Sequence, residues 1–79
     1  METRANYVQV GIFSQEGNAR NTAEAFRQAG ILPTVLRQES RGRTFWRVIL
    51  GPSTTAGDRS AVLRKARELG FADAYPVGG

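Results

Sequence analysis

The chain has 79 residues, 41% of them hydrophobic and 23% charged, and it contains neither Cys nor His. This length predicts one small domain without a deep catalytic cavity, and the missing residue types exclude thiolate nucleophiles, disulfides and the usual zinc ligands. We therefore expect a non-enzymatic domain that needs no metal or cofactor. Eleven basic residues, ten of them Arg, outnumber seven acidic ones for a net charge of +4, which favours an anionic partner.

The amino-terminal half begins with residues 1–6, which are polar and aperiodic and predict a linker or leader. Residues 7–13 (YVQVGIF) alternate and predict a strand. One face of this strand carries Val8, Val10 and Ile12, and the other carries Tyr7, Gln9, Gly11 and Phe13. Residues 17–29 have apolar side chains at helical spacing, with Ser14 or Asn18 as the expected cap and Gly30 as the stop.

The middle of the chain predicts a hairpin. Residues 31–38 (ILPTVLRQ) read as a strand, with Pro33 acceptable only at its start or on a sheet edge. A polar connector at 39–43 leads into a third strand at 44–50 (TFWRVIL), which Gly51-Pro52 ends.

The last third predicts a helix and a final strand. Thr55-x-x-Asp58 resembles a capping box, apolar residues follow at helical spacing as far as Leu69, and Gly70 closes the helix. Residues 71–77 (FADAYPV) predict a short strand, and 78–79 form a tail. The domain therefore spans residues 7–77.

The two halves repeat with an offset of 40 residues. Matched pairs include Val8 with Val48, Gly11 with Gly51, Gly30 with Gly70, and Ile31 with Phe71. Two interleaved β-α-β units in this order predict an α+β fold of the ferredoxin-like type, β-α-β-β-α-β, with a four-stranded antiparallel sheet and both helices on one face. The other face of the sheet is expected to be open.

The open face is the candidate binding surface. If the apolar parity of each strand faces the helices, the third strand buries Trp46, Val48 and Leu50 and displays Phe45, Arg47 and Ile49. Tyr7, Gln9 and Gly11 of the neighbouring first strand lie beside them. An apolar platform edged with polar groups is typical of a binding site, although a flanking segment or a second copy covering the sheet is the alternative.

Three features of this surface have competing interpretations. Gly11 marks either a bulge or a close approach of ligand, and the connector Arg41-Gly42-Arg43 is either a solvated hairpin tip or an anion clamp. Arg47 brings five donors to an apolar face, so it needs an acceptor. That acceptor is either a ligand or an intramolecular partner such as Gln9 or Glu39.

Short motifs in this order resemble the sporulation-related repeat, or SPOR, domain. They are Val8-Gln9-Val10-Gly11-x-Phe13, Arg47-Val48-x-x-Gly51-Pro52, and the Ala-Gly-Ile and Leu-Gly-Phe segments that follow the two helices. The resemblance covers residues 7–77. One departure is Ile12, where the family commonly has Ser.

The resemblance implies a bacterial peptidoglycan-binding module of the periplasm or cell envelope, in a parent protein that is usually membrane-anchored. It implies binding of glycan strands stripped of their stem peptides, localisation to the division septum, and contacts from the positions of Gln9, Phe45 and Arg47. Tyr7, Ile12 and Ile49 complete the expected binding set. We expect a monomer and no nucleic acid partner.

Two other functions fit the same architecture. An RNA-recognition module has the same element order and binds single-stranded RNA across its sheet, and residues 41–48 partly match its aromatic motif. Arg43 and Thr44 occupy the motif positions that call for an aromatic and a small residue, which weighs against RNA. The other candidate is a structural module that pairs its open face with another domain.

Overall fold

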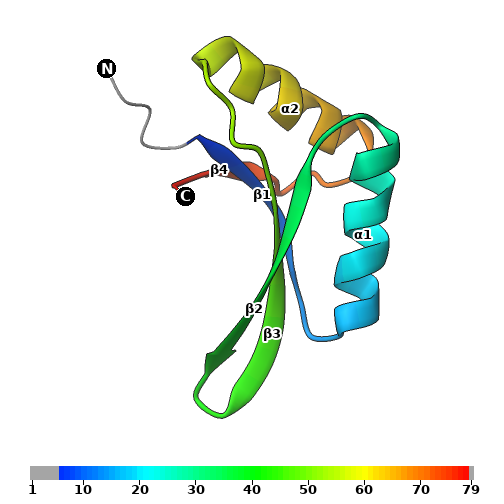
Figure 1. Cartoon of the computed structure of the whole chain (residues 1–79), viewed down its shortest axis with the longest axis vertical. Coiled ribbons are helices and arrows are strands. Elements are labelled where there is room, and N and C mark those ends of the chain that lie inside the picture. Colours follow the sequence, from blue (N-terminus) through cyan, green and yellow to red (C-terminus); the bar gives the residue numbers. More distant parts are fainter. Residues whose placement is uncertain (1–5, 79) are drawn as a thin grey trace.

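The structure is a computed structural model that describes residues 6–78 (Figure 1). Residues 1–5 of the predicted linker and Gly79 of the predicted tail lie outside the described residues. The elements in chain order are β1 (Tyr7–Phe13), α1 (Glu16–Gln28), β2 (Pro33–Ser40), β3 (Arg43–Leu50), α2 (Ala56–Glu68) and β4 (Tyr75–Val77). This confirms the predicted β-α-β-β-α-β order and the α+β, ferredoxin-like class.

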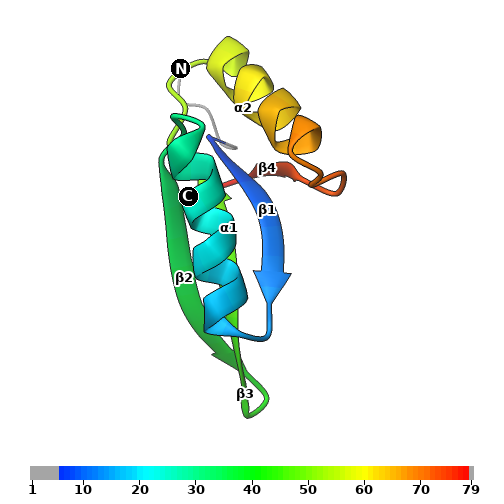
Figure 2. The ribbon, with the colours of Figure 1, turned by 90° about the vertical axis from the view of Figure 1, so that its right-hand side faces the viewer.

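The four strands form one antiparallel sheet in the order β2-β3-β1-β4. Strands β3 and β1 are central, and Pro33 opens the edge strand β2, where its missing N–H is tolerated. Figure 2 shows α1 along one face of the sheet, α2 beside the end where β4 lies, and the β2-β3 hairpin extending beyond the start of α1.

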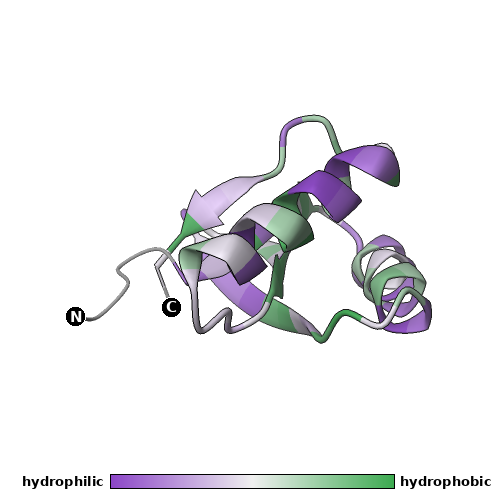
Figure 3. Cartoon of the chain, turned by 90° about the horizontal axis from the view of Figure 1, so that it is seen from above, coloured by the Kyte–Doolittle hydropathy of each residue, from purple (hydrophilic) through white to green (hydrophobic). Residues whose placement is uncertain are grey.

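One core joins the sheet to both helices. Its largest fully buried side chains are Phe26, Leu50, Val8 and Val48. Helix α1 adds Ala19 and Ala23, and α2 adds Ala66, so small residues let both helices approach the strands closely. Hydrophilic and hydrophobic residues alternate along the helices, as expected when one side of each is covered (Figure 3). Within residues 6–78, no helix covers the opposite face of the sheet.

The two helices end alike, as the repeat predicts. Gly30 and Gly70 both have positive φ, 84° and 100°. The next residue in each case donates its N–H back to the helix, Ile31 to the carbonyl of Phe26 and Phe71 to that of Ala66, both at 3.0 Å. These bonds satisfy carbonyls that the helix end leaves unpaired.

The helix starts differ from each other. The side chain of Thr55 accepts a hydrogen bond from the N–H of Asp58 at 3.0 Å, which confirms the predicted cap of α2. For α1 the predicted caps, Ser14 and Asn18, are wrong. The N-cap is Gln15, whose side chain makes no capping hydrogen bond.

Two element lengths differ from the predictions. The connector expected at 39–43 is a two-residue turn of Arg41 and Gly42, with φ of 53° and 77°, so Arg43 belongs to β3. Positive φ at both turn residues matches the twist of the adjoining strands and lets the ladder run to the tip. The final strand is shorter than predicted and begins at Tyr75 rather than at residue 71.

A β-bulge in β1 overturns the predicted alternation. Gln9 pairs with Ile49 but Gly11 pairs with Val48, so Val10 is an extra residue. Beyond it the faces exchange. Phe13 lies opposite Trp46 and packs against the core, whereas Ile12 lies opposite Arg47 and is 60% exposed.

Candidate functional site

The open face is defined by the cross-strand pairs that alternate with the core pairs. Directly opposed residues in an antiparallel sheet share a face, and Val8 with Leu50 and Gly11 with Val48 mark the helix side. The open face therefore carries Tyr7, Gln9 and Ile12 of β1, Arg43, Phe45, Arg47 and Ile49 of β3, Thr34, Leu36, Gln38 and Ser40 of β2, and Tyr75 and Val77 of β4.

Three of these side chains form a hydrogen-bonded relay across three strands. Arg47 donates from Nε to Oε1 of Gln9 at 2.7 Å, and Gln9 donates from Nε2 to the hydroxyl of Tyr75 at 2.9 Å. We call these three residues the donor relay. Gln9, which is only 5% exposed, thus fixes the positions of Arg47 and Tyr75.

The direction of each bond in the donor relay follows from the chemistry of its first member. A guanidinium has no acceptor, so the amide of Gln9 must present its oxygen to Arg47 and its nitrogen to Tyr75. Tyr75 therefore accepts from Gln9 and keeps its own O–H to donate elsewhere. The two Nη groups of Arg47 also remain as donors, because only Nε is bonded to Gln9. The donor relay therefore offers N–H and O–H donors, which pair with hydrogen-bond acceptors.

The exposed area of the face differs from what the alternation predicted. Ile49 lies on the open face as expected, but it is only 6% exposed and offers little surface. Gly11 is not on this face, because it pairs with Val48 on the core side, and a Cβ there would meet Cε1 of Phe13 at 2.9 Å. The bulge interpretation of Gly11 is therefore confirmed. Tyr75, half exposed, joins the site unpredicted.

The remaining predicted residues lie where the sequence placed them. Phe45, Tyr7 and Arg47 are half-buried on the open face, and Trp46 packs against the core. A half-buried aromatic ring on a sheet surface is anchored by its neighbours and keeps part of its face available for contact.

Charge is distributed unevenly between the two faces. The four strands contain one carboxylate, Glu39, and it lies opposite Thr44 on the helix side. Glu39 pairs with Arg37 at 3.2 Å, so of the two intramolecular partners considered for Arg47, Gln9 is confirmed and Glu39 is wrong. The strand residues of the open face include two Arg and no carboxylate, which favours an anionic ligand.

A comparison with known protein families matches residues 3–78 to the SPOR domain. The chain belongs to the SPOR domain family. SPOR domains are peptidoglycan-binding modules of cell division proteins in the bacterial periplasm and envelope. Searches of curated proteins and of solved structures gave no match.

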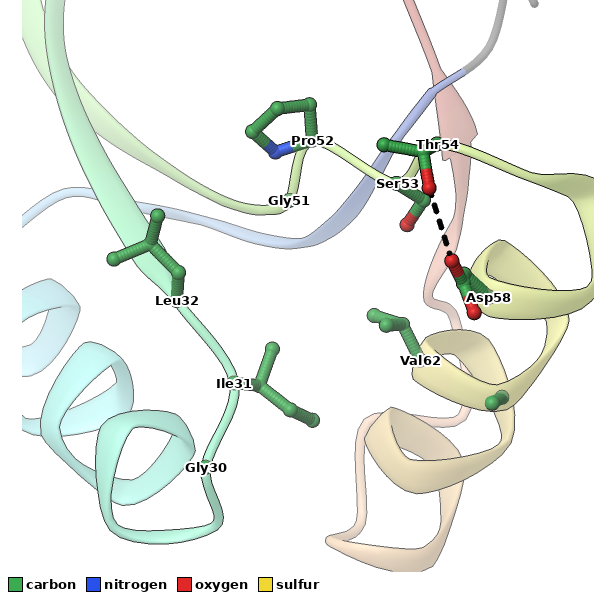
Figure 4. Close-up of a pocket in the computed structure, with 10 residues that line it drawn as sticks. Gly30, Ile31, Leu32, Gly51, Pro52, Ser53, Thr54, Asp58 and Val62 are labelled. Atoms are coloured by element: carbon green, nitrogen blue, oxygen red, sulfur yellow. Dashed lines mark hydrogen bonds between the residues drawn. The ribbon is translucent and has the colours of Figure 1, made fainter.

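Of the hollows on the described surface of this SPOR domain, one lies near the donor relay and another lies between two connecting segments. The first, of about 380 Å³, adjoins the bulge and is lined by Gln9, Val10, Gly11, Ile12, Asp73 and Tyr75. The second, also about 380 Å³, lies between the connections that precede β2 and α2 (Figure 4). Its walls are mainly apolar, and the hydroxyl of Thr54 donates to Asp58 at 3.1 Å beside it. Only the first adjoins the donor relay.

Residues 6–78 of the SPOR domain contain neither a cluster of metal ligands nor a helix that could span a membrane. Within residues 6–78 no three acidic, Cys or His side chains gather as metal ligands would. Neither α1 nor α2 has the length and apolar character that a membrane-crossing helix requires.

Proposed function

We propose that the open face binds peptidoglycan glycan strands from which the stem peptides have been removed, and that this binding localises the parent protein to the division septum. The observation that carries the proposal is the donor relay, whose free hydrogens belong to a guanidinium and a phenol. A carboxylate flanked by sugar hydroxyls and acetamido oxygens supplies the acceptors that this arrangement lacks.

Removal of the stem peptide changes the ligand at one position. The lactyl group of each muramic acid is an amide while the peptide is attached and becomes a free carboxylate once it is removed. Arg47 can meet that carboxylate end-on through its two Nη groups, because Nε is held by Gln9. A partly shielded, charge-assisted pair of this kind contributes about 1.5–3 kcal/mol, enough to separate stripped from intact strands.

The other site residues take complementary roles in this proposal. Phe45 and Tyr7 offer flat apolar area to the C–H faces of sugar rings, and exposed Ile12 adds an aliphatic contact opposite Arg47. Gln9 serves mainly to position its two neighbours, because it is buried and bonded at both ends. Ile49 contributes little contact area.

A binding titration tests the proposal with three ligands: amidase-stripped strands, the same strands with their carboxylates converted to methylamides, and intact strands. The SPOR domain should bind the stripped strands about tenfold or more tightly than the other two. Arg47→Ala should remove this preference. Arg37→Ala is the matched control, because Arg37 lies on the helix side and pairs with Glu39.

Two results would overturn the proposal. One is equal affinity for stripped and methylamidated strands, and the other is an Arg47→Ala variant that folds and binds as the parent chain does. Tighter binding of single-stranded RNA than of stripped strands would favour the RNA-recognition alternative. Septal localisation is tested by a fluorescent fusion in dividing bacteria, whose midcell signal should be lost in Arg47→Ala.

We further propose that the domain acts as a monomer within a membrane-anchored parent protein. The open face has to be free for the glycan, so a dimer that covered it would compete with binding. Sedimentation with and without stripped strands tests the monomeric state. The chain should sediment as a monomer in both cases, whereas a face-to-face dimer should be present without ligand and dissociate as ligand is added.

A further inference from the structure

Arg43 occupies a position that the sequence alone did not assign to a strand. Because the hairpin turn consists only of Arg41 and Gly42, Arg43 is the first residue of β3 and pairs with Ser40. Alternate residues of a strand point to the same face, so Arg43 shares the open face with Phe45 and Arg47. The face thus carries a row of guanidinium, aromatic ring and guanidinium.

The two guanidinium groups of this row differ in their surroundings. Arg47 is half-buried and held by Gln9, whereas Arg43 is exposed. Glu39, the one carboxylate of the strands, is bonded to Arg37 on the other face and does not neutralise either of them. Charge of one sign is therefore repeated along β3 at two points separated by about 13 Å of strand.

The end of β3 that carries Arg43 has no paired strand on the side of β1. Pairing between β1 and β3 ends at Phe13 with Trp46, so β1 does not reach residues 43–45. This part of the hairpin extends beyond α1 (Figure 2). A long ligand seated at Arg47 can continue over Phe45 toward the tip without meeting another of the described helices or strands.

We propose that Arg43 binds a second carboxylate of the same stripped strand, one disaccharide repeat away from the carboxylate at Arg47. This inference rests on the proposed function. The free carboxylates of a stripped strand recur on every second sugar, and Phe45 lies where the intervening ring would pass. The row therefore sets a minimum ligand length, and Arg43 is a specificity-determining residue for strands with at least two free carboxylates.

An NMR titration with a stripped disaccharide, which has one free carboxylate, and a stripped tetrasaccharide, which has two, tests this. Arg43→Gln should weaken the tetrasaccharide about two- to fivefold, the size of an exposed ion pair, and leave the disaccharide unchanged. Arg41→Gln makes the same charge change in the turn and is the matched control. It should weaken the tetrasaccharide by less than Arg43→Gln does.

Three results would overturn the inference: no loss in Arg43→Gln, an equal loss for both ligands, or the same loss in Arg41→Gln. Failure of the proposed function looks different. In that case the parent chain shows no preference for free carboxylates and Arg47→Ala changes neither ligand. If Arg47→Ala weakens both ligands and Arg43→Gln weakens neither, only the inference about Arg43 fails.

Discussion

Replacing Gln9 with Met tests whether Gln9 acts on the ligand through Arg47. Met is similar in size but can form neither hydrogen bond of the donor relay, so the guanidinium loses the acceptor that fixes Nε. Ordering a free long side chain on binding costs about 0.5–1.5 kcal/mol. We therefore expect about a two- to tenfold loss of affinity for stripped strands.

The same substitution should lower stability by a limited amount. Each lost hydrogen bond is worth about 0.5–1.5 kcal/mol, but Arg47 and Tyr75 are partly exposed and water can replace Gln9 as their partner. A net loss of about 1–2 kcal/mol corresponds to a fall in Tm of roughly 5–15 °C for a domain of this size. Circular dichroism melting measures it and shows whether the variant is folded during the titration.

A mutant cycle separates positioning from direct contact. If Gln9 acts only by positioning Arg47 and Tyr75, then Gln9→Met should change affinity less than twofold in a chain that already carries Arg47→Ala and Tyr75→Phe. If Gln9 itself touches the glycan, the two losses should multiply. Full additivity in folded variants would refute the positioning role.

Two further substitutions test the open face and the cap of α2. Ile12→Glu places a carboxylate directly opposite Arg47, where it should occupy the guanidinium and lower affinity at least fivefold, with Ile12→Gln as the neutral control in the same titration. Because Ile12 is 60% exposed, stability should stay within about 0.5 kcal/mol. Thr55→Ala should cost about 1 kcal/mol in urea unfolding by removing the cap on Asp58, with glycan affinity unchanged.

The overall fold could be predicted because several independent patterns agreed. The repeat with an offset of 40 residues, the alternation in β3 and the two glycines after the helices all gave the same topology. The positive φ of Gly30 and Gly70 shows the physical basis of one of these patterns. A glycine that ends a helix is a local signal of backbone conformation, so tertiary packing does not change what it predicts.

The composition of the open face was harder to predict, because which residues of a strand share a face depends on how that strand pairs with its neighbour. A bulge adds one residue to one strand, and nothing in the alternation of Val8, Val10 and Ile12 shows that the partner strand lacks it. Gly11 was the available signal. Taken as a bulge, it would have placed Ile12 outward and Phe13 in the core.

Two other features needed three-dimensional information. The tight turn contains Arg41 at positive φ, a conformation that is typical of Gly or Asn, so the sequence pattern predicts a longer connector and places Arg43 outside the strand. Tyr75 entered the site only because β4 pairs Gln9 with it. A short strand near a chain end carries too little periodicity to assign its faces.

The direction of the donor relay also determines which sugars the face should reject. Its unused hydrogens, on the two Nη groups of Arg47 and the hydroxyl of Tyr75, are not bonded to Gln9 and can only be donated. Walls whose amino sugars have lost their acetyl groups present ammonium groups, which bring positive charge and hydrogens where the face needs lone pairs. If the face binds stripped strands as proposed, de-N-acetylated glycan should bind weakly even with its lactyl carboxylates free, and enzymes that deacetylate the wall should limit where this domain binds.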